Sequence, residues 1–473
     1  MPSLKDIFED NNMNIKDINV PKRHGLSSTK KIMLGFLAAI CIGTVLLSLP
    51  ISVAEGSPDV LTSLFTATTS VCVTGLVVVD TYAHWTLFGK IIILILIQLG
   101  GLGIVAFTSA LMIITGKKVG LRGRIVIQDA YGLSSLQGLV KFVRKVIIGT
   151  LCVELFGMLC YLPAFISRFG AANGTWYALF NAISAFCNAG IDIMGPDSLA
   201  SFNSSPSVLI TTMFLIFMGG IGFVVWWDVL DTASVCKKKK IRFRNFWKKL
   251  KLHTKLVLLV TAILLFGGAL LLFILEYNNP DTIGNMSLGD KILNSLFQSV
   301  TLRTAGFFSY GQAGMSDSST MLCLVLMIIG GSPVGTAGGI KTVTAAVLVC
   351  TVIAVIKGKN EAVIFKKSIS DTLVKRSVAV IIISLCVVAL FNVLLMVTNN
   401  LSLIDSSYEV CSAIGTVGLT RGITSSLNPI GRIIIIVAMY LGRIGPISLF
   451  IAFSSKYSIK NSIHYSEAKI FVG

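Results

Sequence analysis

The segment Phe65-Thr-Ala-Thr-Thr-Ser-Val-Cys-Val-Thr-Gly75 is short and polar, lies between two long apolar runs, and recurs three more times along the chain. The related segments are Phe180-Asn-Ala-Ile-Ser-Ala-Phe-Cys-Asn-Ala-Gly190, Phe297-Gln-Ser-Val-Thr-Leu-Arg-Thr-Ala-Gly306 and Tyr408-Glu-Val-Cys-Ser-Ala-Ile-Gly-Thr-Val-Gly418. Their final glycines are 115, 116 and 112 residues apart, and this period indicates four copies of one structural unit.

Eight apolar runs of roughly 20 residues or more flank these segments, which is the length that crosses a ~30 Å hydrocarbon core. They lie near Ile32–Ile51, Phe88–Ile114, Val146–Phe165, Val208–Val229, Leu256–Leu275, Thr320–Ile356, Val378–Val397 and Ile430–Phe453. The chain is 54% hydrophobic and only 13% charged, so a soluble fold could not cover its apolar surface. The sequence therefore predicts an all-α integral membrane protein.

The first run could also be read as a signal peptide, because Lys30 and Lys31 precede it and Ala54 lies near a possible cleavage point. The apolar core of a cleaved signal is about 7–15 residues long, and this run is longer. A retained first helix is the favoured interpretation.

The net charge of +18 is distributed as a membrane protein requires and not as a nucleic-acid surface. Of the 40 Lys and Arg residues, 32 lie in 1–31, 115–145, 236–255, 357–376 and 454–473. These are the two ends of the chain and the connections after the second, fourth and sixth runs. Because positive residues next to spans mark the cytoplasmic side, we expect both termini to be cytoplasmic in a multi-pass protein of the cell membrane.

Each unit thus consists of a span, a short polar re-entry and a second span. The predicted parts are a cytoplasmic N-terminal segment 1–31, repeat 1 (32–115), repeat 2 (146–230), a basic cytoplasmic linker 231–255, repeat 3 (256–357), repeat 4 (378–453) and a cytoplasmic tail 454–473. A unit with two crossings begins and ends on the same side, so the copies are parallel and can surround a common axis. This predicts eight transmembrane helices and four re-entrant pore helices around a pseudo-fourfold axis.

Non-helical backbone at membrane depth is tolerated only where it lines a cavity or is buried in protein. Four such segments at one axis therefore predict a pore, in which glycine lets successive carbonyls point at an ion. The predicted filter residues are Cys72, Val73, Thr74, Gly75, Cys187, Asn188, Ala189, Gly190, Arg303, Thr304, Ala305, Gly306, Gly415, Thr416, Val417 and Gly418. None is a carboxylate, which favours potassium over a small divalent ion. The alternative is that the glycines only permit close helix packing.

A second glycine phrase follows each segment after 24 to 29 residues: Gly100-Gly-Leu-Gly103, Gly219-Gly-Ile-Gly222, Gly330-Gly-Ser-Pro333 and Gly442-Arg-Ile-Gly445. In repeat 3 the phrase extends to Lys341, and its proline and five glycines predict a break in the sixth span. The predicted gate residues in this loop are Gly330, Gly331, Ser332, Pro333, Gly335, Thr336, Ala337, Gly338, Gly339 and Lys341. A phosphate-binding loop is disfavoured, since no strand precedes the phrase and Ile340 separates Gly339 from Lys341.

Arg443 stands where the other three copies have glycine. A charge near the bilayer centre costs roughly 2.5–3.5 kcal/mol on insertion scales, so we expect Arg443 to face the pore or pair with carbonyls of the loop. A purely structural arginine bound to helix ends is the alternative. Glu154 is a second charge within a span, and its partner is not evident from the sequence.

These phrases resemble the Trk/Ktr/HKT superfamily of potassium transporters, and the length and first phrase are most similar to the bacterial Ktr-type membrane subunit. The resemblance implies that Gly75, Gly190, Gly306 and Gly418 form a potassium-selective filter. It also implies that the loop and Arg443 obstruct the pore. The implied partners are a second copy of the chain and a cytosolic nucleotide-binding regulatory ring, and the implied ions are K⁺ with, in some members, dependence on Na⁺.

No stretch outside the spans exceeds about 31 residues, too short for a soluble domain, so no organic cofactor is expected in this chain. The basic cluster Lys237-Lys-Lys-Lys-Ile-Arg-Phe-Arg244 could contact the regulatory ring or anionic lipid, or could serve orientation alone. Two other function classes fit the sequence less well. A solute–cation symporter would place polar side chains at a midplane pocket, and a membrane-bound enzyme would need a catalytic cluster, which the sequence lacks.

Overall fold

The computed structural model of the chain describes residues 27–54, 56–114, 120–131, 138–239, 245–359 and 361–445, which are mostly helical. The predicted tail 454–473, most of segment 1–31 and residues 240–244 of the basic cluster lie outside the described residues.

The described residues include one feature that an all-α prediction misses. A hairpin of β1 (Val363–Ile364) and β2 (Lys367–Ser368) lies between repeats 3 and 4. Its turn residues Phe365 and Lys366 both have positive φ, as a tight two-residue hairpin turn requires. Because they are not the Asn-Gly or Asp-Gly pair that normally marks such a turn, the hairpin could not be predicted from the sequence.

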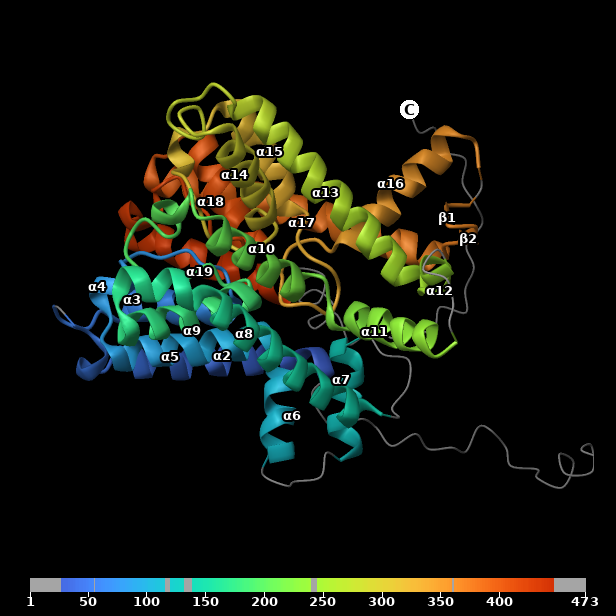
Figure 1. Ribbon diagram of the computed structural model, residues 1–473, viewed down its shortest axis with the longest axis horizontal. Helices are drawn as coiled ribbons and strands as arrows, with labels where there is room; N and C mark the ends of the chain where they lie inside the picture. Colours follow the sequence, from blue (N-terminus) through green and yellow to red (C-terminus); the bar gives the residue numbers. More distant parts are fainter. Residues whose placement is uncertain are drawn as a thin grey trace, which may run out of the picture.

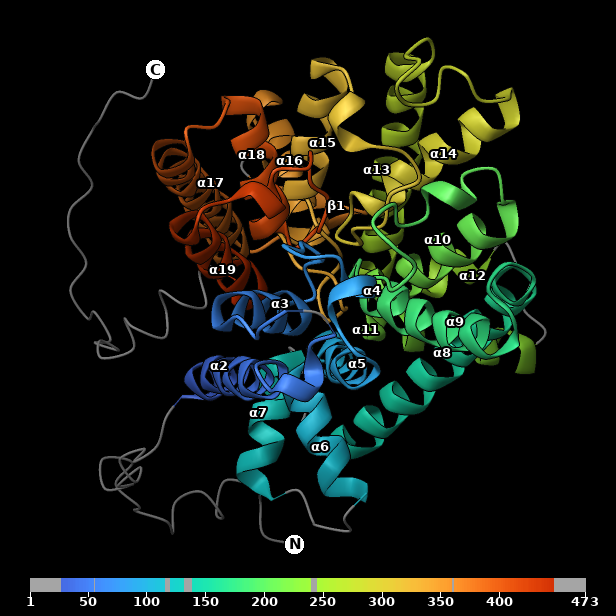
Figure 2. The same ribbon diagram turned by 90° about the vertical axis from the view of Figure 1, so that its left-hand side faces the viewer.

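The same succession of helices occurs four times: a long helix, a shorter helix that ends at a glycine segment, and a third helix. The four sets are α2 (Ser28–Leu47), α3 (Val60–Cys72) and α5 (Leu87–Leu102); α8 (Leu139–Phe169), α9 (Ala171–Cys187) and α10 (Pro206–Gly220); α13 (Leu252–Glu276), α14 (Leu288–Thr301) and α15 (Asp317–Ile328); and α17 (Asp371–Asn399), α18 (Leu403–Gly415) and α19 (Pro429–Ile444). Figure 2 shows the sets following one another around the molecule in chain order, from blue through green and yellow to red.

The third helix of each set packs against the short helix of the next set. The pairs are α5 with α9, α10 with α14, α15 with α18, and α19 with α3. Because the last pair joins the end of the chain to its beginning, the arrangement is a closed ring of four sets.

The remaining elements connect the sets or continue their third helices. They are α4 (Thr81–His84), α6 (Ile104–Ile114), α7 (Leu121–Tyr131), α11 (Phe223–Lys238), α12 (Phe246–Lys249) and α16 (Thr342–Ile356), with short 3₁₀ turns at Pro50–Ser52, Ala200–Phe202, Gln312–Gly314 and Thr424–Ser426. Helices α6 and α7 project away from the ring, as does α16 at its opposite side (Figure 1).

Four helices, α2, α8, α13 and α17, are long and apolar enough to cross a membrane unbroken. The described parts of the other four predicted spans are divided or shorter. The second and fourth bend by 105° between α5 and α6 and by 96° between α10 and α11. The sixth is split into α15 and α16, and the eighth is described only to Gly445.

The two bends fall at the second glycine phrase. Gly103 and Gly222 have φ of 82° and 92°, a conformation that ends a helix and that glycine adopts without steric cost. The sequence predicted each of these spans as one apolar run and did not predict the bend. In repeat 3 the same position is opened further into the loop from Gly330 to Lys341, as the proline and glycines predicted.

Burial separates the long helices from the short ones. In the unbroken spans only 17–28% of the apolar window is buried within the molecule, and side chains such as Phe266 and Val397 point outward. The last turns of α3, α9, α14 and α18 are completely buried. The apolar long helices thus face outward and the more polar short helices lie inside. This is the arrangement of a multi-pass membrane protein with its functional segments at the centre.

Candidate functional site: a ring of four glycines

The four repeated glycines lie together at the centre of the ring of helices. We call Gly75, Gly190, Gly306 and Gly418 the glycine ring. A Cβ atom on any of them would collide with the carbonyl oxygen that precedes the glycine of another set. The colliding pairs are Gly75 with Ala189, Gly190 with Ala305, Gly306 with Val417, and Gly418 with Thr74. The series runs once around the four sets and closes on itself.

The backbone leading to each ring glycine has the same unusual conformation. Two residues before the glycine φ is positive in all four sets, at Val73 (56°), Asn188 (59°), Thr304 (72°) and Thr416 (52°). The φ angles of the ring glycines are also positive, from 65° to 100°, while the residue between the two positions has the usual negative φ. In an extended strand successive carbonyls point in opposite directions, and this alternation turns them to one side.

The sixteen residues predicted from the sequence therefore come together at one place. All of them are buried except Gly190, which is partly exposed. Each segment directly follows the C-terminus of α3, α9, α14 or α18, so four helix ends with partial negative charge surround the ring. This arrangement concentrates carbonyl oxygens and negative potential without any carboxylate side chain among the sixteen residues.

Hydroxyl groups in the last turns of the short helices hold the segments in place. In repeats 1 and 4 the ring glycine's N–H donates to a side-chain hydroxyl, from Gly75 to Thr69 and from Gly418 to Ser412, each at 3.0 Å. In repeats 2 and 3 the hydroxyl donates instead to the carbonyl just beyond the glycine. These bonds run from Ser184 to Ile191 and from Thr301 to Phe307.

The role of these four hydroxyl residues was not predicted, although the sequence contains a signal for it. When the four phrases are aligned on their first aromatic residue, Thr69, Ser184, Thr301 and Ser412 occupy the same position. A repeated hydroxyl at one position of a buried, otherwise variable segment is a recognisable mark of a shared hydrogen-bonding role.

Repeat 3 departs from the others because its phrase is one residue shorter. Its helix α14 is capped by Leu302 in a right-handed conformation, whereas the other three short helices are capped by a left-handed residue. The side chain of Arg303 is buried, and its Nη2 donates to the carbonyl oxygen of Gly330 at 3.2 Å. One segment of the ring is thereby tied to the start of the interrupting loop.

The first glycine of the second phrase allows the third helix to approach the ring closely. A Cβ atom on Gly100, Gly219 or Gly442 would collide with the carbonyl of the residue four before the ring glycine in its own set. The carbonyls concerned belong to Val71, Phe186 and Ile414. Here, and not in the ring, glycine acts as a small residue that permits close packing.

A cavity of about 380 Å³ opens on one side of the glycine ring, and all four ring glycines line it. We call this cavity the vestibule. Its wall also carries three charged residues, namely Asp80, Asp192 and Arg421. Repeats 1 and 2 thus contribute carboxylates to the vestibule, and repeat 4 contributes an arginine.

The loop from Gly330 to Lys341 docks onto the bend of repeat 2. The N–H groups of Ser332 and Thr336 donate to the carbonyls of Gly220 and Gly219 at 3.0 and 3.1 Å. In return the N–H of Phe223 donates to the carbonyl of Val334 at 3.0 Å. Ser332, Thr336 and Ala337 are buried. The bent helix exposes backbone groups that the loop satisfies, which explains how non-helical backbone persists in the interior of the protein.

Arg443 joins the loop to repeat 1. Its Nη1 donates to the carbonyl of Thr336 in the loop, and its Nη2 donates to the carbonyl of Gly100 at the bend of repeat 1. Lys341 is bound in a similar way, with its Nζ donating to the carbonyl of Ala337 at 2.7 Å. Both cations line a second cavity of about 340 Å³, together with Gly335 and Ala337. This loop cavity does not include the ring glycines among its lining residues.

Glu154, the charge whose partner the sequence left open, is buried on α8 behind repeat 2 of the ring. Its Oε2 accepts from Nε2 of Gln98 at 3.2 Å, and the other amide atom of Gln98 accepts from the thiol of Cys187 at 3.4 Å. The acid thus reaches a predicted filter residue through one glutamine on α5.

Comparison with known proteins identifies the family of this arrangement. Residues 27–465 match the model of the TrkH family, described as a cation transport protein. The chain belongs to the TrkH family of cation transport proteins. Membership confirms the resemblance stated from the repeated phrases and makes the chain a transport protein, not an enzyme.

Individual relatives extend over almost the whole chain. The Ktr system potassium uptake protein B of Bacillus subtilis is 39% identical over 442 residues, covering 93% of this chain and 96% of its own. The potassium/sodium uptake protein NtpJ of Enterococcus hirae is 36% identical over 469 residues, covering 98% and 100%. The crystal structure of the potassium transporter TrkH from Vibrio parahaemolyticus superposes with a TM-score of 0.70 at 17% identity, covering 91% and 86%, which shows a shared fold.

The hydroxyl bonds to the ring glycines lead to a stability prediction. Ser412→Ala and Thr69→Val each leave a buried N–H group without its partner, at a cost of about 1–3 kcal/mol. We expect both variants to unfold a few degrees below the parent protein when the purified chain is heated in detergent and followed by tryptophan fluorescence. Thr351→Val is the control, because the Thr351 hydroxyl bonds only to Val347 of its own helix. Equal melting of all four proteins would contradict the assigned role of the hydroxyls.

Proposed function

We propose that the chain is the potassium-translocating subunit of a Ktr/Trk-type uptake system and that the glycine ring is its selectivity filter. The observation that carries the proposal is the closed series of contacts among the four ring glycines and their neighbouring carbonyls. It is supported by the relatives whose names state potassium uptake or potassium transport.

The chemistry of the segments favours K⁺. Backbone carbonyls replace the hydration shell of a monovalent ion without adding charge, while small divalent ions require charged oxygen ligands. The four helix ends add partial negative charge on the same axis. We assign ion binding to the sixteen filter residues, with K⁺ at Gly75, Gly190, Gly306 and Gly418. The name of the Enterococcus hirae relative includes sodium, and we extend to this chain the possibility that Na⁺ accompanies or drives uptake.

The proposed architecture has eight membrane crossings, in four parallel repeats with α3, α9, α14 and α18 as pore helices. The predicted boundaries of 32–115, 146–230, 256–357 and 378–453 are kept for the repeats. With the basic connections on the cytoplasmic side, the vestibule faces outward and the loop cavity faces the cytoplasm. Both termini are then cytoplasmic.

We further propose that the loop from Gly330 to Lys341 and Arg443 form the gate. The loop lies between the glycine ring and the loop cavity, since Arg303 of the ring contacts its first residue and Lys341 lines that cavity. Two cations at this level oppose the passage of another cation. Displacement of the loop would require Arg443 to release the carbonyls of Thr336 and Gly100.

The proposed partners are a second copy of the chain, a cytosolic nucleotide-binding regulatory ring and membrane lipid. The term "Ktr system" in the names of relatives supports a separate regulatory component. The outward-facing apolar surfaces of the long helices are suited to lipid and to a second copy. The alternative of a solute–cation symporter receives no support from the comparisons.

The function itself is tested by uptake. Expression in a cell that lacks its own potassium uptake should restore growth at low potassium, and the purified chain in vesicles should take up rubidium in preference to sodium. A protein that carries both ions equally, or neither, would overturn the proposal.

The filter assignment predicts the effect of a side chain in the ring. Gly418→Ser places a Cβ against the carbonyl of Thr74 at a residue whose φ is 95°. We expect rubidium uptake to fall at least roughly tenfold, because the loss of one carbonyl ligand is comparable to one hydrogen bond to an ion. Gly170→Ser is the matched control, since Gly170 has a φ of 79° but open space around it. Similar uptake by both variants would count against the ring as filter.

The gate assignment predicts a gain of function. Arg443→Ala removes both bonds that hold the loop and one charge that repels cations, so rubidium flux through the purified chain in vesicles should rise. Arg432→Ala serves as the control, because Arg432 lies on the same helix and bonds only to Leu427 and Ser425 near its outer end. Unchanged flux in a normally folded Arg443→Ala protein would contradict the assignment.

The vestibule predicts a dependence on external pH. Burial raises the pKa of the Asp192 carboxyl to about 6, and the neighbouring Asp80 adds to the shift. Its negative charge is therefore present at pH 7.5 and is lost as the external pH falls through about 6. A charge near an ion in water contributes roughly 0.5–1 kcal/mol, so uptake at low potassium should drop about threefold.

Asp192→Asn should remove this dependence and stay at the lower rate throughout. Asp197→Asn is the control, as Asp197 lies exposed in the same loop and does not line the vestibule. The idea fails if the Asp192→Asn protein keeps the pH profile of the parent.

A further inference from the structure

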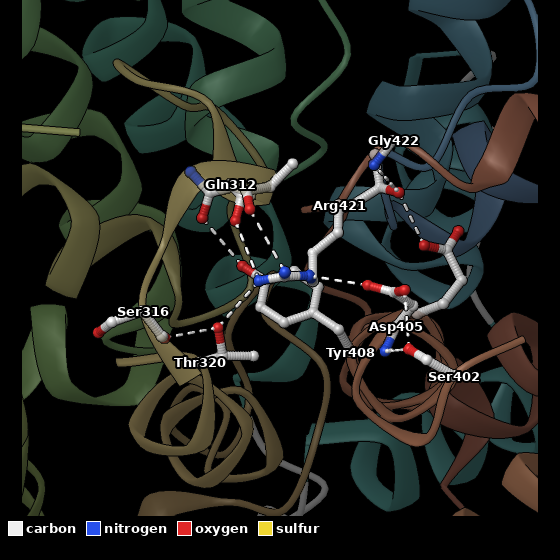
Figure 3. Close-up of polar contacts among 11 residues, drawn as sticks. Gln312, Ser316, Thr320, Ser402, Asp405, Tyr408, Arg421 and Gly422 are labelled. Atoms are coloured by element: carbon white, nitrogen blue, oxygen red, sulfur yellow. Dashed lines mark hydrogen bonds and ion pairs between the residues drawn. The ribbon is translucent and has the colours of Figure 1, made fainter. Parts of the chain in front are cut away.

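The segment that follows the ring glycine of repeat 4 is tied to repeat 3 by a polar network at the rim of the vestibule. Its centre is Arg421, three residues after Gly418. Figure 3 shows the Arg421 side chain lying between Gln312 and Thr320 on one side and Asp405 on the other. The proposed functions of the filter and gate make no use of this network.

Arg421 makes four bonds with three nitrogen atoms. Its Nε donates to Oδ1 of Asp405 at 2.9 Å, in an ion pair at the start of α18. Its Nη1 donates to the hydroxyl of Thr320 at 3.0 Å and to the carbonyl of Gln312 at 3.4 Å. Its Nη2 donates to the carbonyl of Ala313 at 3.3 Å. One side chain therefore joins the segment after the ring glycine of repeat 4, its own pore helix and the outer segment of repeat 3.

Gln312 continues the network into the interior. Its buried side-chain Oε1 accepts from the hydroxyl of Tyr408 at 2.9 Å and from Nε2 of Gln298 at 2.5 Å. Tyr408 belongs to pore helix α18, and Gln298 belongs to pore helix α14. Gln312 thus accepts a hydrogen bond from Arg421 at its backbone carbonyl and connects the pore helices of repeats 3 and 4 through its side chain.

A second acidic residue of α18 also binds the segment that follows Gly418. Glu409 lies one turn after Asp405 and is fully buried. It accepts from the hydroxyls of Thr420, at 2.7 Å, and Thr424. Asp405 and Glu409 together fix residues 420 to 424 on the pore helix, whereas Arg421 alone extends the attachment to repeat 3.

The network is particular to repeat 4. The residues three positions after the other ring glycines are Val78, Ile193 and Ser309, none of them charged. A planar guanidinium can serve several acceptors in fixed directions, and a lysine ammonium cannot replace this geometry. The ion pair with Asp405 also offsets the positive charge that Arg421 would otherwise present to an entering cation.

We propose that Arg421 is a positioning residue for ion selectivity: through Asp405 and Gln312 it fixes the fourth filter segment relative to the third. The inference rests on the proposed filter. It assigns a role in selectivity to a side chain that lies outside the filter and is not an ion ligand. A ring of carbonyls discriminates between ions only while its four parts keep their spacing, so release of one segment lowers selectivity before it abolishes uptake.

The test compares rubidium uptake and its inhibition by sodium in vesicles containing the full chain. The variants are Arg421→Gln, Arg421→Lys and Asp405→Asn. Arg432→Gln is the matched control, because it removes an arginine from the same outer region whose bonds stay within repeat 4. We expect Arg421→Gln to lose roughly tenfold of the preference for rubidium over sodium, the worth of about one hydrogen bond. Arg421→Lys and Asp405→Asn should lose part of it, and the control none.

Several outcomes would overturn the proposal. Undiminished selectivity in Arg421→Gln would do so directly. The proposal would also fail if Arg421→Lys had the selectivity of the parent and Arg421→Gln changed only the apparent affinity for rubidium. That pair of results would show that the charge of Arg421 matters and not its positioning of the segments. If Arg421→Gln gives no folded protein, Thr320→Val removes a single partner, and unchanged selectivity in both Thr320→Val and Asp405→Asn would refute the idea. An unselective parent protein would instead overturn the proposed filter itself.

Discussion

The structure depends on one constraint: backbone that is not helical must find hydrogen-bond partners inside a protein that lipid surrounds. Four helices end at the same central point, and each leaves carbonyls that its own helix cannot satisfy. The hydroxyls of Thr69, Ser184, Thr301 and Ser412 bind groups on the far side of each turn. The carbonyls that remain lie at the centre, where the proposed K⁺ would take the place of the missing donors.

The second glycine phrase follows from the same constraint. Helices α5, α10 and α19 can approach the ends of the short helices only where they carry glycine, at Gly100, Gly219 and Gly442. That glycine also weakens the helix, and at Gly103 and Gly222 the helices bend sharply. The bends expose new carbonyls, and in repeat 2 the interrupting loop uses them. Close packing at the ring and breakage of the spans are therefore linked through one short phrase.

Most of this arrangement could be predicted from the sequence because the phrases repeat. The period of the four phrases predicted that the sixteen segment residues would lie together, and the glycines of repeat 3 predicted the loop. The bends at Gly103 and Gly222 were not predicted, because an apolar run reads the same whether straight or bent. The β1–β2 turn was not predicted, because Phe365 and Lys366 carry no turn signature. The partners of Glu154, Arg303 and Arg421 could not be predicted either, since they come from distant parts of the chain.

The four repeats have diverged in their charges while keeping one backbone. The ring has the same left-handed and glycine positions in every set, so its geometry tolerates little change. The cations near it belong to repeats 3 and 4: Arg303 and Lys341 on one, Arg421 and Arg443 on the other. Arg303, Arg421 and Arg443 each bind a group of another segment, and Lys341 binds a carbonyl within its own loop. The backbone of the ring is thus common to all four copies, whereas the cationic side chains that tie its segments to their surroundings come from the last two.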